Sequence, residues 1–174
     1  GEDSLISLAG PANKQGRIAA DNICGKDSRY SGSQGSSIIK VFDMTAAVTG
    51  LNERNAEKAG LSVDKVILSP MSHAGYYPGG KVMTMKVVFE KETYRLLGAQ
   101  IVGYEGVDKR IDVLATAIRA GMKATDLKEL DLAYAPPYSS AKDPVNMAGF
   151  MIENIASGQL KQFHLGDIKT LPLV

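Results

Sequence analysis

Apolar and polar residues alternate along two segments in the middle of the chain, residues 81–90 and 95–103. The alternating apolar positions are Met83, Met85, Val87 and Phe89 in the first segment and Leu97, Ala99 and Ile101 in the second. A period of two is typical of strands, and the short separation at 91–94 predicts an antiparallel hairpin. Shorter apolar runs at 37–43 and 63–69 predict two further strands.

A helical period follows the hairpin. Apolar residues recur at i, i+3, i+4, i+7 and i+11, which predicts an amphipathic helix; they are Ile111, Leu114, Ala115, Ile118 and Met122. A second helix is predicted from Asp143 and Pro144 to about Ser157, and Gly158 closes it. Its apolar residues cover more than one face, so we expect contacts on more than one side, one of them with a second subunit.

Capping residues predict three more helices. Proline favours the first helical position, asparagine and threonine favour the N-cap, and glycine favours the end of a helix. The predicted segments are 11–24, after Gly10 and with Pro11 first and Gly25 at the end, then 52–59 between Asn52 and Gly60, and 125–130 capped by Thr125.

The order of the predicted elements indicates the fold class. After the first helix come a strand, a short helix, three strands and then helices, without the strand–helix–strand alternation of parallel sheets. We therefore predict an α+β fold, an antiparallel sheet with helices packed on one face. Segment 26–36 is polar and rich in Gly and Ser, which predicts a linker. The predicted division is 1–36, 37–160 and a tail at 161–174.

Composition narrows the function classes. The net charge is +1 and the Lys and Arg residues are scattered, which argues against nucleic acid or an anionic membrane as a partner. No run approaches eighteen apolar residues, so no membrane span is predicted. Cys24 is the one cysteine, which excludes an intramolecular disulfide and fits a reducing cytoplasm. The chain opens without Met and closes on an apolar run at 169–174, and we expect both ends to be cut from a longer polypeptide.

Motifs for a self-contained active site are missing from the sequence. It has no G-x-G-x-x-G, no P-loop and no C-x-x-C. His73 and His164 are the two histidines, and neither has Cys or His at metal-ligand spacing, so no metal site is expected. Cys24 lies on a predicted helix with no second cysteine, so we expect an inert thiol.

Two aromatic segments carry the remaining candidate chemistry. Residues 73–80 place Tyr76 and Tyr77 directly before Pro-Gly-Gly, and residues 132–144 hold two tyrosines around two consecutive prolines. The prolines stiffen the second segment, which could present Tyr138 rigidly to a ligand. An ordinary β-turn in the first segment and a structural bend in the second are the alternatives, and either X-Pro bond could be cis.

These segments resemble a known family. The run from Leu130 to Asn146, with its Tyr-Ala-Pro-Pro-Tyr-Ser and Lys-Asp-Pro sequences, is similar to the dimerisation domain of the pyridine nucleotide–disulfide oxidoreductases. Within that family it most resembles the coenzyme A-disulfide reductases, the NADH oxidases and the persulfide reductases. The resemblance covers about residues 37–160, and its supporting segments are 42–50, 73–80, 97–103 and 108–112.

The resemblance implies cofactors that other parts of the polypeptide would hold. The family binds FAD and uses NAD(P)H through earlier domains, which also carry a redox cysteine that Cys24 does not match. Residues 8–24 look like the last helix of the flavin domain. Pro11, Ala12 and Asn13 would then approach the flavin, because a helix start offers unpaired N–H groups. We expect this chain alone to be inactive and to hold neither FAD, NAD(P)H nor coenzyme A.

The resemblance also implies a homodimer whose subunits complete each other's active sites. Tyr138 and one of Tyr76 or Tyr77 are the positions that match the family's motif. They would lie over the partner's coenzyme A and redox cysteine, where a phenol can donate a hydrogen bond to a thiolate. His73, Lys142 and Asp143 are candidates for contacts with coenzyme A or with supporting groups.

The implied function of the intact protein is electron transfer from NAD(P)H through flavin and a cysteine to coenzyme A disulfide, a persulfide or a polysulfide. The alternative within the family is an NADH oxidase that reduces oxygen. An alternative of another class is an assembly module that only dimerises. In some members of the family a rhodanese-like domain follows at about residue 160, and the tail would suit a linker into one.

Overall fold

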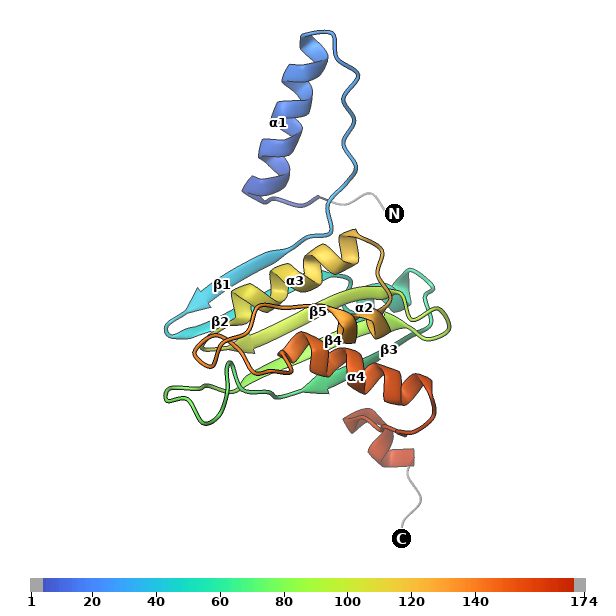
Figure 1. Ribbon diagram of the computed structural model, residues 1–174. Helices are drawn as coiled ribbons and strands as arrows, with labels where there is room; N and C mark the ends of the chain where they lie inside the picture. Colours follow the sequence, from blue (N-terminus) through green and yellow to red (C-terminus); the bar gives the residue numbers. More distant parts are fainter. Residues whose placement is uncertain (1–4, 171–174) are drawn as a thin grey trace.

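A five-stranded antiparallel sheet forms the centre of the computed structural model, which describes residues 5–170 (Figure 1). Its strand order is β1-β2-β5-β4-β3, with β1 Ser37–Val41, β2 Met44–Gly50, β3 Val63–Leu68, β4 Met83–Glu90 and β5 Leu96–Gly103. The helices are α1 Ala9–Ile23, α2 Glu53–Lys58, α3 Val107–Arg119, η1 Ala124–Glu129, α4 Pro144–Ala156 and η2 Leu165–Thr170. All neighbouring strands are antiparallel, so the predicted α+β class is confirmed.

Helices α3 and α4 lie across one face of the sheet, and the main core lies between them and the strands (Figure 1). The alternation predicted for 81–90 is confirmed, because its apolar side chains are buried on this face. The core includes Met83, Met85, Val87 and Phe89 of β4, Ile111 and Leu114 of α3, and Val145, Ala148 and Ile152 of α4. Complete burial of one such side chain stabilises the fold by about 1.5–3 kcal/mol.

The short helix α2 covers a corner of the opposite face. Asn52 caps it as predicted, accepting the N–H of Asn55 at 2.8 Å. Ala56 of α2 packs in a small separate cluster with Val88 and Leu97. The expectation of helices on one face therefore holds for the long helices α3 and α4, while α2 packs behind the sheet.

The sequence pattern misses strand β2. The chain turns at Phe42, whose φ is +52°, and returns antiparallel to β1 so that Ile39 pairs with Ala46. Two alanines and a glycine make up much of this strand, and both residue types are depleted in strands and give little hydrophobic contrast. Ala47 is nonetheless buried in the main core, because α3 packs closely on β2.

Two predicted helix boundaries need correction. Helix α1 begins at Ala9 with Leu8 as its N-cap, so Pro11 lies in the first turn rather than at the first position. A proline is tolerated there because the N–H that it lacks would have no partner in the helix. The segment predicted at 125–130 is a 3-10 helix that begins one residue earlier, and Asp126 accepts a backbone N–H at its start at 3.1 Å.

Helix α1 stands away from the sheet and buries no side chain (Figure 1). The linker 26–36 contains neither helix nor strand, as predicted. Its end is fixed to the domain by Gln34, whose side chain donates to the Ala115 carbonyl at 2.8 Å and to the Thr49 hydroxyl at 3.1 Å. The linker therefore meets the sheet domain at a defined point beside α3 and β2.

Candidate functional site

The two aromatic segments singled out in the sequence lie side by side. One is the loop between β3 and β4, and the other joins η1 to α4. The Ala74 N–H donates to the Ser139 carbonyl at 2.9 Å. The hydroxyls of Tyr76 and Tyr134, which are 58 residues apart in the sequence, lie 2.8 Å from each other. Folding therefore joins the two segments into one polar surface.

Local hydrogen bonds shape the β3–β4 loop. The Ser72 N–H donates to the Lys81 carbonyl at 2.7 Å, and the Lys81 N–H donates to the Ser72 hydroxyl at 3.1 Å, which closes the loop. Inside it the Tyr77 N–H donates to the Ala74 carbonyl at 2.9 Å, and Gly79 has a φ of +94°. This φ favours glycine, so the turn predicted from Pro-Gly-Gly is present.

The two prolines of the second segment lie inside a tight turn. The Ala135 carbonyl accepts the N–H groups of Tyr138 at 2.9 Å and of Ser139 at 3.2 Å. Pro136 and Pro137 therefore occupy the central positions of the turn, where no N–H is needed. Every peptide bond in the described part of the chain is trans. The bend predicted from the prolines is present, and it is stiff because each proline ring fixes the φ angle of its residue.

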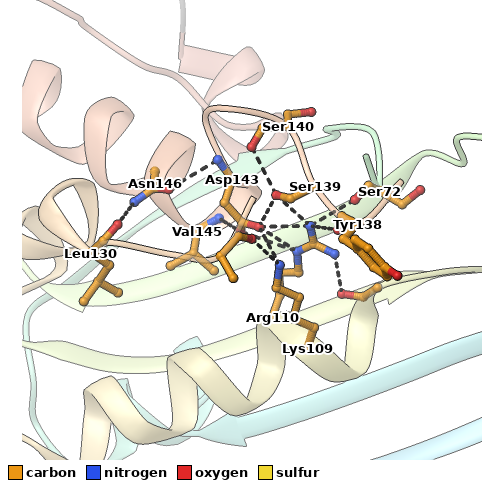
Figure 2. Close-up of polar contacts among 12 residues, drawn as sticks. Ser72, Lys109, Arg110, Leu130, Tyr138, Ser139, Ser140, Asp143, Val145 and Asn146 are labelled. Carbon is orange, nitrogen blue, oxygen red and sulfur yellow. Dashed lines mark hydrogen bonds and ion pairs between the residues drawn. The ribbon is translucent and has the colours of Figure 1, made fainter. Parts of the chain in front are cut away.

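A buried ion pair fastens both segments to α3 (Figure 2). Arg110 on α3 is 1% exposed and Asp143 at the start of α4 is 3% exposed. Arg110 Nη2 lies 2.9 Å from Asp143 Oδ2, and Nε lies 3.2 Å from the same oxygen. Nη2 also donates to the carbonyls of Ser72 at 2.9 Å and Tyr138 at 3.3 Å. A buried ion pair requires such additional partners to offset its loss of hydration.

Asp143 binds two groups at once: the guanidinium of Arg110 and the backbone at the start of α4. Its Oδ1 accepts the Val145 N–H at 3.0 Å, which caps the helix, and its Oδ2 accepts the Ser139 hydroxyl at 2.6 Å. Burial alone would raise the pKa of Asp143. The hydrogen bonds from Ser139, Val145 and Arg110, with the charge of Arg110, outweigh burial and hold this pKa below its ordinary value of 3.8. The carboxylate is therefore charged at neutral pH.

Asn146 joins the same unit to the end of η1 (Figure 2). Its Nδ2 donates to the carbonyls of Leu127 and Leu130, both at 3.0 Å, and its Oδ1 accepts the Asp143 N–H at 3.2 Å. The aromatic segment thus leaves η1 from a fixed point and enters α4 at another fixed point. Little freedom remains for the residues between them.

The tyrosine hydroxyls form the exposed edge of this assembly. Tyr76 is 77% exposed and Tyr134 is 46% exposed. The hydrogen bond with Tyr76, aided by partial desolvation and by the charge of Tyr76, raises the pKa of Tyr134 above its ordinary value of 10.0. In such a pair one hydroxyl donates its hydrogen to the oxygen of the other. The accepting hydroxyl still carries its own hydrogen, and the bond that it accepts makes it a stronger donor. The pair can therefore donate a hydrogen bond to an anion such as a thiolate.

The other residues predicted for the site differ in their surroundings. Tyr138 is 71% exposed, and the exposed Lys142 places its ammonium group 5.8 Å from the ring centre of Phe150. His73 is buried, and its ring lies edge-on to Tyr77 at 5.6 Å between centroids. His73 thus packs beneath the loop, whereas Tyr138 and Lys142 are open to a ligand.

The residues predicted to approach a flavin lie at the start of α1. Leu8 gives this helix no side-chain cap, so its first N–H groups face an open end. Pro11 lines a hollow of about 730 Å³ between α1 and α3. The side chain of Asn13 donates back to the Ala9 carbonyl at 2.9 Å, and Ala12 is exposed. An uncapped helix start suits the electron-rich edge of a flavin ring. Pro11 has no N–H and the Ala12 N–H donates to the Leu8 carbonyl at 3.2 Å, so the role of Pro11, Ala12 and Asn13 stays a prediction.

Other classes of site were also tested against the described residues. No group of three His, Cys, Asp or Glu side chains between residues 5 and 168 could hold a metal ion. His164 lies near the β3 edge, with its Nε2 3.6 Å from Asp64 Oδ1. Cys24 is exposed at the end of α1. No helix in the part of the chain that the structure describes is long and apolar enough to cross a membrane.

The sequence prediction gave no role to Arg110 or Tyr134. A signal for Arg110 was available, because it lies on the apolar stripe of α3, one turn before the buried Leu114. A charge on a buried stripe requires a partner, and that requirement predicts a binding network. Tyr134 belongs to the same motif as Tyr138, and only the folding of the two segments shows that it pairs with Tyr76.

Comparison with known families agrees with this architecture. Residues 36–145 match the family model described as pyridine nucleotide-disulphide oxidoreductase, dimerisation domain. The chain is 39% identical to the coenzyme A disulfide reductase of Staphylococcus epidermidis over 146 residues, which are 83% of this chain and 33% of that protein. The chain thus spans about a third of the length of the curated relatives that it matches.

Solved structures share the fold. The crystal structure of reduced Bacillus anthracis CoADR-RHD has a TM-score of 0.93 and 47% identity, and the match covers 97% of this chain and 30% of that one. The NAD-dependent persulfide reductase from A. fulgidus has a TM-score of 0.91 and 43% identity, covering 95% and 31%. The water-forming NADH oxidase from Lactobacillus brevis has a TM-score of 0.86 at 24% identity, covering 92% and 36%, a likeness in fold alone.

Proposed function

The chain belongs to the pyridine nucleotide–disulphide oxidoreductase family, with residues 36–145 as its dimerisation domain, and on this premise we propose that it is the C-terminal part of a flavin-dependent NAD(P)H oxidoreductase. The proposed substrate is coenzyme A disulfide, a persulfide or a polysulfide. The names of the similar proteins support this class, since they include a coenzyme A disulfide reductase and a persulfide reductase. The proposed location is the cytoplasm, and the chain alone is expected to be inactive.

The proposed division of the chain assigns residues 1–36 to the end of the FAD domain and residues 37–160 to the dimerisation domain. Residues 161–174 are proposed as a tail or as a linker to a following domain, for which a rhodanese-like domain is the candidate. Two observations support the first boundary: α1 buries no side chain, and the match to the dimerisation-domain model begins at residue 36.

The paired hydroxyls of Tyr76 and Tyr134, 2.8 Å apart, carry the functional proposal. In a homodimer the pair lies over the partner's redox cysteine, whose thiolate attacks one sulfur of the substrate disulfide. The S–S bond breaks, a mixed disulfide forms, and the other half leaves with the electron pair as a thiolate. A hydrogen bond from the outward-facing phenol stabilises that thiolate as its charge develops.

The remaining predicted residues surround this pair in the proposal. Tyr138 and Tyr77 offer further phenols, and Lys142 offers a cation for the phosphate groups of coenzyme A. His73 is buried against Tyr77 and supports the loop. A contact with coenzyme A itself is the alternative role for His73. Exposure supports the roles of Tyr138 and Lys142.

Pro11, Ala12 and Asn13 are the residues proposed to face FAD. They would lie against the edge of the flavin ring at the start of α1, where the helix dipole supplies positive potential. When bound, FAD would relay the electron pair of NAD(P)H to the redox cysteine. The nucleotide-binding units come from the preceding part of the proposed polypeptide.

Conservative tyrosine variants of the intact polypeptide test the proposed function. Tyr76→Phe and Tyr134→Phe are each expected to lower turnover with coenzyme A disulfide by roughly 10- to 100-fold, the effect of losing one hydrogen bond to a charged group. Tyr138→Phe is expected to lower it less. Flavin reduction by NAD(P)H, followed anaerobically by flavin absorbance, stays unchanged, because the phenols act only on the thiol step.

Tyr94→Phe, in the turn that joins β4 to β5 at the opposite end of β4 from the Tyr76 loop, is the matched control and should leave both half-reactions unchanged. Equal loss in both half-reactions, or no loss with either Tyr76→Phe or Tyr134→Phe, would contradict the proposed function. An intact protein that consumes oxygen and ignores coenzyme A disulfide would favour the NADH oxidase alternative. A strict monomer in light scattering would contradict both the proposed homodimer and the alternative that the chain is only an assembly module.

A further inference from the structure

Arg110 is buried too deeply to touch a ligand at the surface, yet it contacts every part of the candidate site. Its exposure is 1%. Beyond Asp143, its Nη1 donates to the Gly106 carbonyl at 3.2 Å and its Nη2 lies 3.3 Å from the Ser139 hydroxyl. Figure 2 shows these contacts converging on the guanidinium from α3, from the β3–β4 loop and from the segment before α4. One side chain therefore links three parts of the fold.

Two of its contacts lie next to the tyrosine pair. Ser72 is four residues before Tyr76, and Tyr138 is four residues after Tyr134. The same nitrogen, Arg110 Nη2, donates to the carbonyl of Ser72 at 2.9 Å and to that of Tyr138 at 3.3 Å. The spacing of the two loops thus depends on this buried nitrogen, together with the direct bond from the Ala74 N–H to the Ser139 carbonyl.

We propose that Arg110 is the positioning residue of the site: its guanidinium holds the two loops at the spacing that lets the hydroxyls of Tyr76 and Tyr134 meet. The catalytic value of this positioning rests on the proposed function, in which the pair donates to a leaving thiolate. The positioning itself is a property of this chain and is measurable without substrate. Arg110 acts through the tyrosines and does not touch the reacting atoms.

The contacts require arginine rather than any buried cation. A guanidinium carries five N–H donors in one plane, and Arg110 uses Nε, Nη1 and Nη2 toward Asp143 and four carbonyl or hydroxyl oxygens. Lysine has three donors on a single nitrogen and cannot reach both loops in this geometry. Arg110→Lys keeps the charge beside Asp143 and removes the fork, so it separates charge from positioning.

Titration of Tyr134 in the 174-residue chain is the first test. Labelling tyrosine with ¹³C at Cζ lets NMR follow each phenol, and Tyr134→Phe assigns the signal. In the wild-type chain the partner hydroxyl raises the pKa of Tyr134. We expect Arg110→Lys to return this pKa toward its ordinary value, as Tyr76→Phe does, because either change breaks the pair.

Two further variants keep this test decisive. Leu114→Ala, one turn further along α3, weakens the core without touching the two loops and should leave the Tyr134 titration unchanged. Ser139→Ala removes the hydroxyl that bridges Arg110 at 3.3 Å and Asp143 at 2.6 Å while keeping the ion pair. It should produce part of the Arg110→Lys shift, and it decides the matter if Arg110→Lys does not fold. The proposal is overturned if the pKa of Tyr134 in Arg110→Lys and in Ser139→Ala equals that of the wild type. It is also overturned if Leu114→Ala shifts this pKa as much as Arg110→Lys does.

Kinetics of the intact enzyme give the second test. Arg110→Lys should lower kcat with coenzyme A disulfide by roughly 10- to 100-fold, the usual cost of a misplaced group, and leave flavin reduction unchanged. Added to Tyr76→Phe it should cause no further loss, because both changes disable the same pair. If Tyr76→Phe proves harmless while Arg110→Lys still shifts the Tyr134 titration, the proposed function fails and the positioning role stands. Additive losses would overturn the positioning role.

Discussion

Two clusters of charge hold this domain together on opposite faces of its sheet, and they differ in their access to water. Arg110 and Asp143 lie on the α3/α4 face with side-chain exposures of 1% and 3%. On the other face Glu53 of α2 bridges Lys65 of β3 and Lys86 of β4, with exposures of 20–24%. Both clusters join a helix to another element, but only the first is sealed from solvent.

The difference explains why the candidate site lies at the buried cluster. A sealed ion pair costs several kcal/mol of hydration per ion unless hydrogen bonds surround it, so its geometry is determined by many partners at once. An exposed cluster can exchange its protein contacts for water with little change in free energy. Rigid placement of Tyr76 and Tyr134 therefore requires the first kind of cluster, and attachment of α2 requires only the second.

The largest expected effect comes from removing one half of the buried pair. Arg110→Met should lower the free energy of unfolding of the 174-residue chain by about 3–5 kcal/mol, because Asp143 stays charged in the interior and keeps only the more distant Lys109 ammonium, 3.8 Å from its Oδ2, as an ion-pair partner. Urea unfolding followed by circular dichroism measures this. The double variant Arg110→Met/Asp143→Asn should recover part of the loss. A loss below about 1 kcal/mol in the single variant would place this pair with the exposed clusters.

The sequence predicted the parts of the fold where hydrophobic contrast is strong. Two patterns correctly indicated which side faces the core: the alternation through Met83 and Phe89, and the helical stripe through Ile111 and Leu114. Strand β2 was not predicted, because its two alanines give the buried and the exposed side of the strand similar hydrophobicity. Pattern alone cannot distinguish such a strand from a loop.

The candidate site was predictable as two segments and not as a contact. The motifs identified the Tyr76 loop and the Tyr138 segment, but the hydrogen bond between Tyr76 and Tyr134 depends on how far two loops approach in space. Arg110 shows the same limit, since the stripe predicted for α3 did not include it, and neither its burial nor its pairing with Asp143 was predicted. Partners across long sequence separations are set by the tertiary fold, which a single sequence does not display.

Acid should weaken the two clusters unequally. Burial would raise the pKa values of Asp143 and Glu53, but their hydrogen bonds to Ser139, Val145 and Arg110 in one case and to the two lysines in the other lower both. Each carboxylate therefore stabilises the fold fully above its unfolded pKa, and this contribution disappears as the pH falls through the folded pKa. The loss lies below the ordinary values of 3.8 for Asp143 and 4.5 for Glu53.

Urea unfolding from about pH 5 down to about pH 2 measures this dependence. Asp143→Asn should be less stable than the wild type at neutral pH and should lose less stability on acidification. Glu53→Gln should flatten the acid dependence by a smaller amount, since solvent screens its partly exposed pairs. Equal flattening by the two variants would contradict the distinction drawn between the clusters.

The smallest expected effect is at the exposed cluster itself. Glu53→Gln should lower the free energy of unfolding at neutral pH by less than about 1 kcal/mol, because Lys65 and Lys86 regain water when the carboxylate charge is removed. High salt should shrink even this difference, as it screens exposed pairs. Glu57→Gln, at an exposed position of the same helix, is the matched control for a change of charge on α2. If Glu53→Gln instead cost as much as Arg110→Met, burial would not be what separates the two clusters, and the shared feature of bridging a helix to another element would have to explain both.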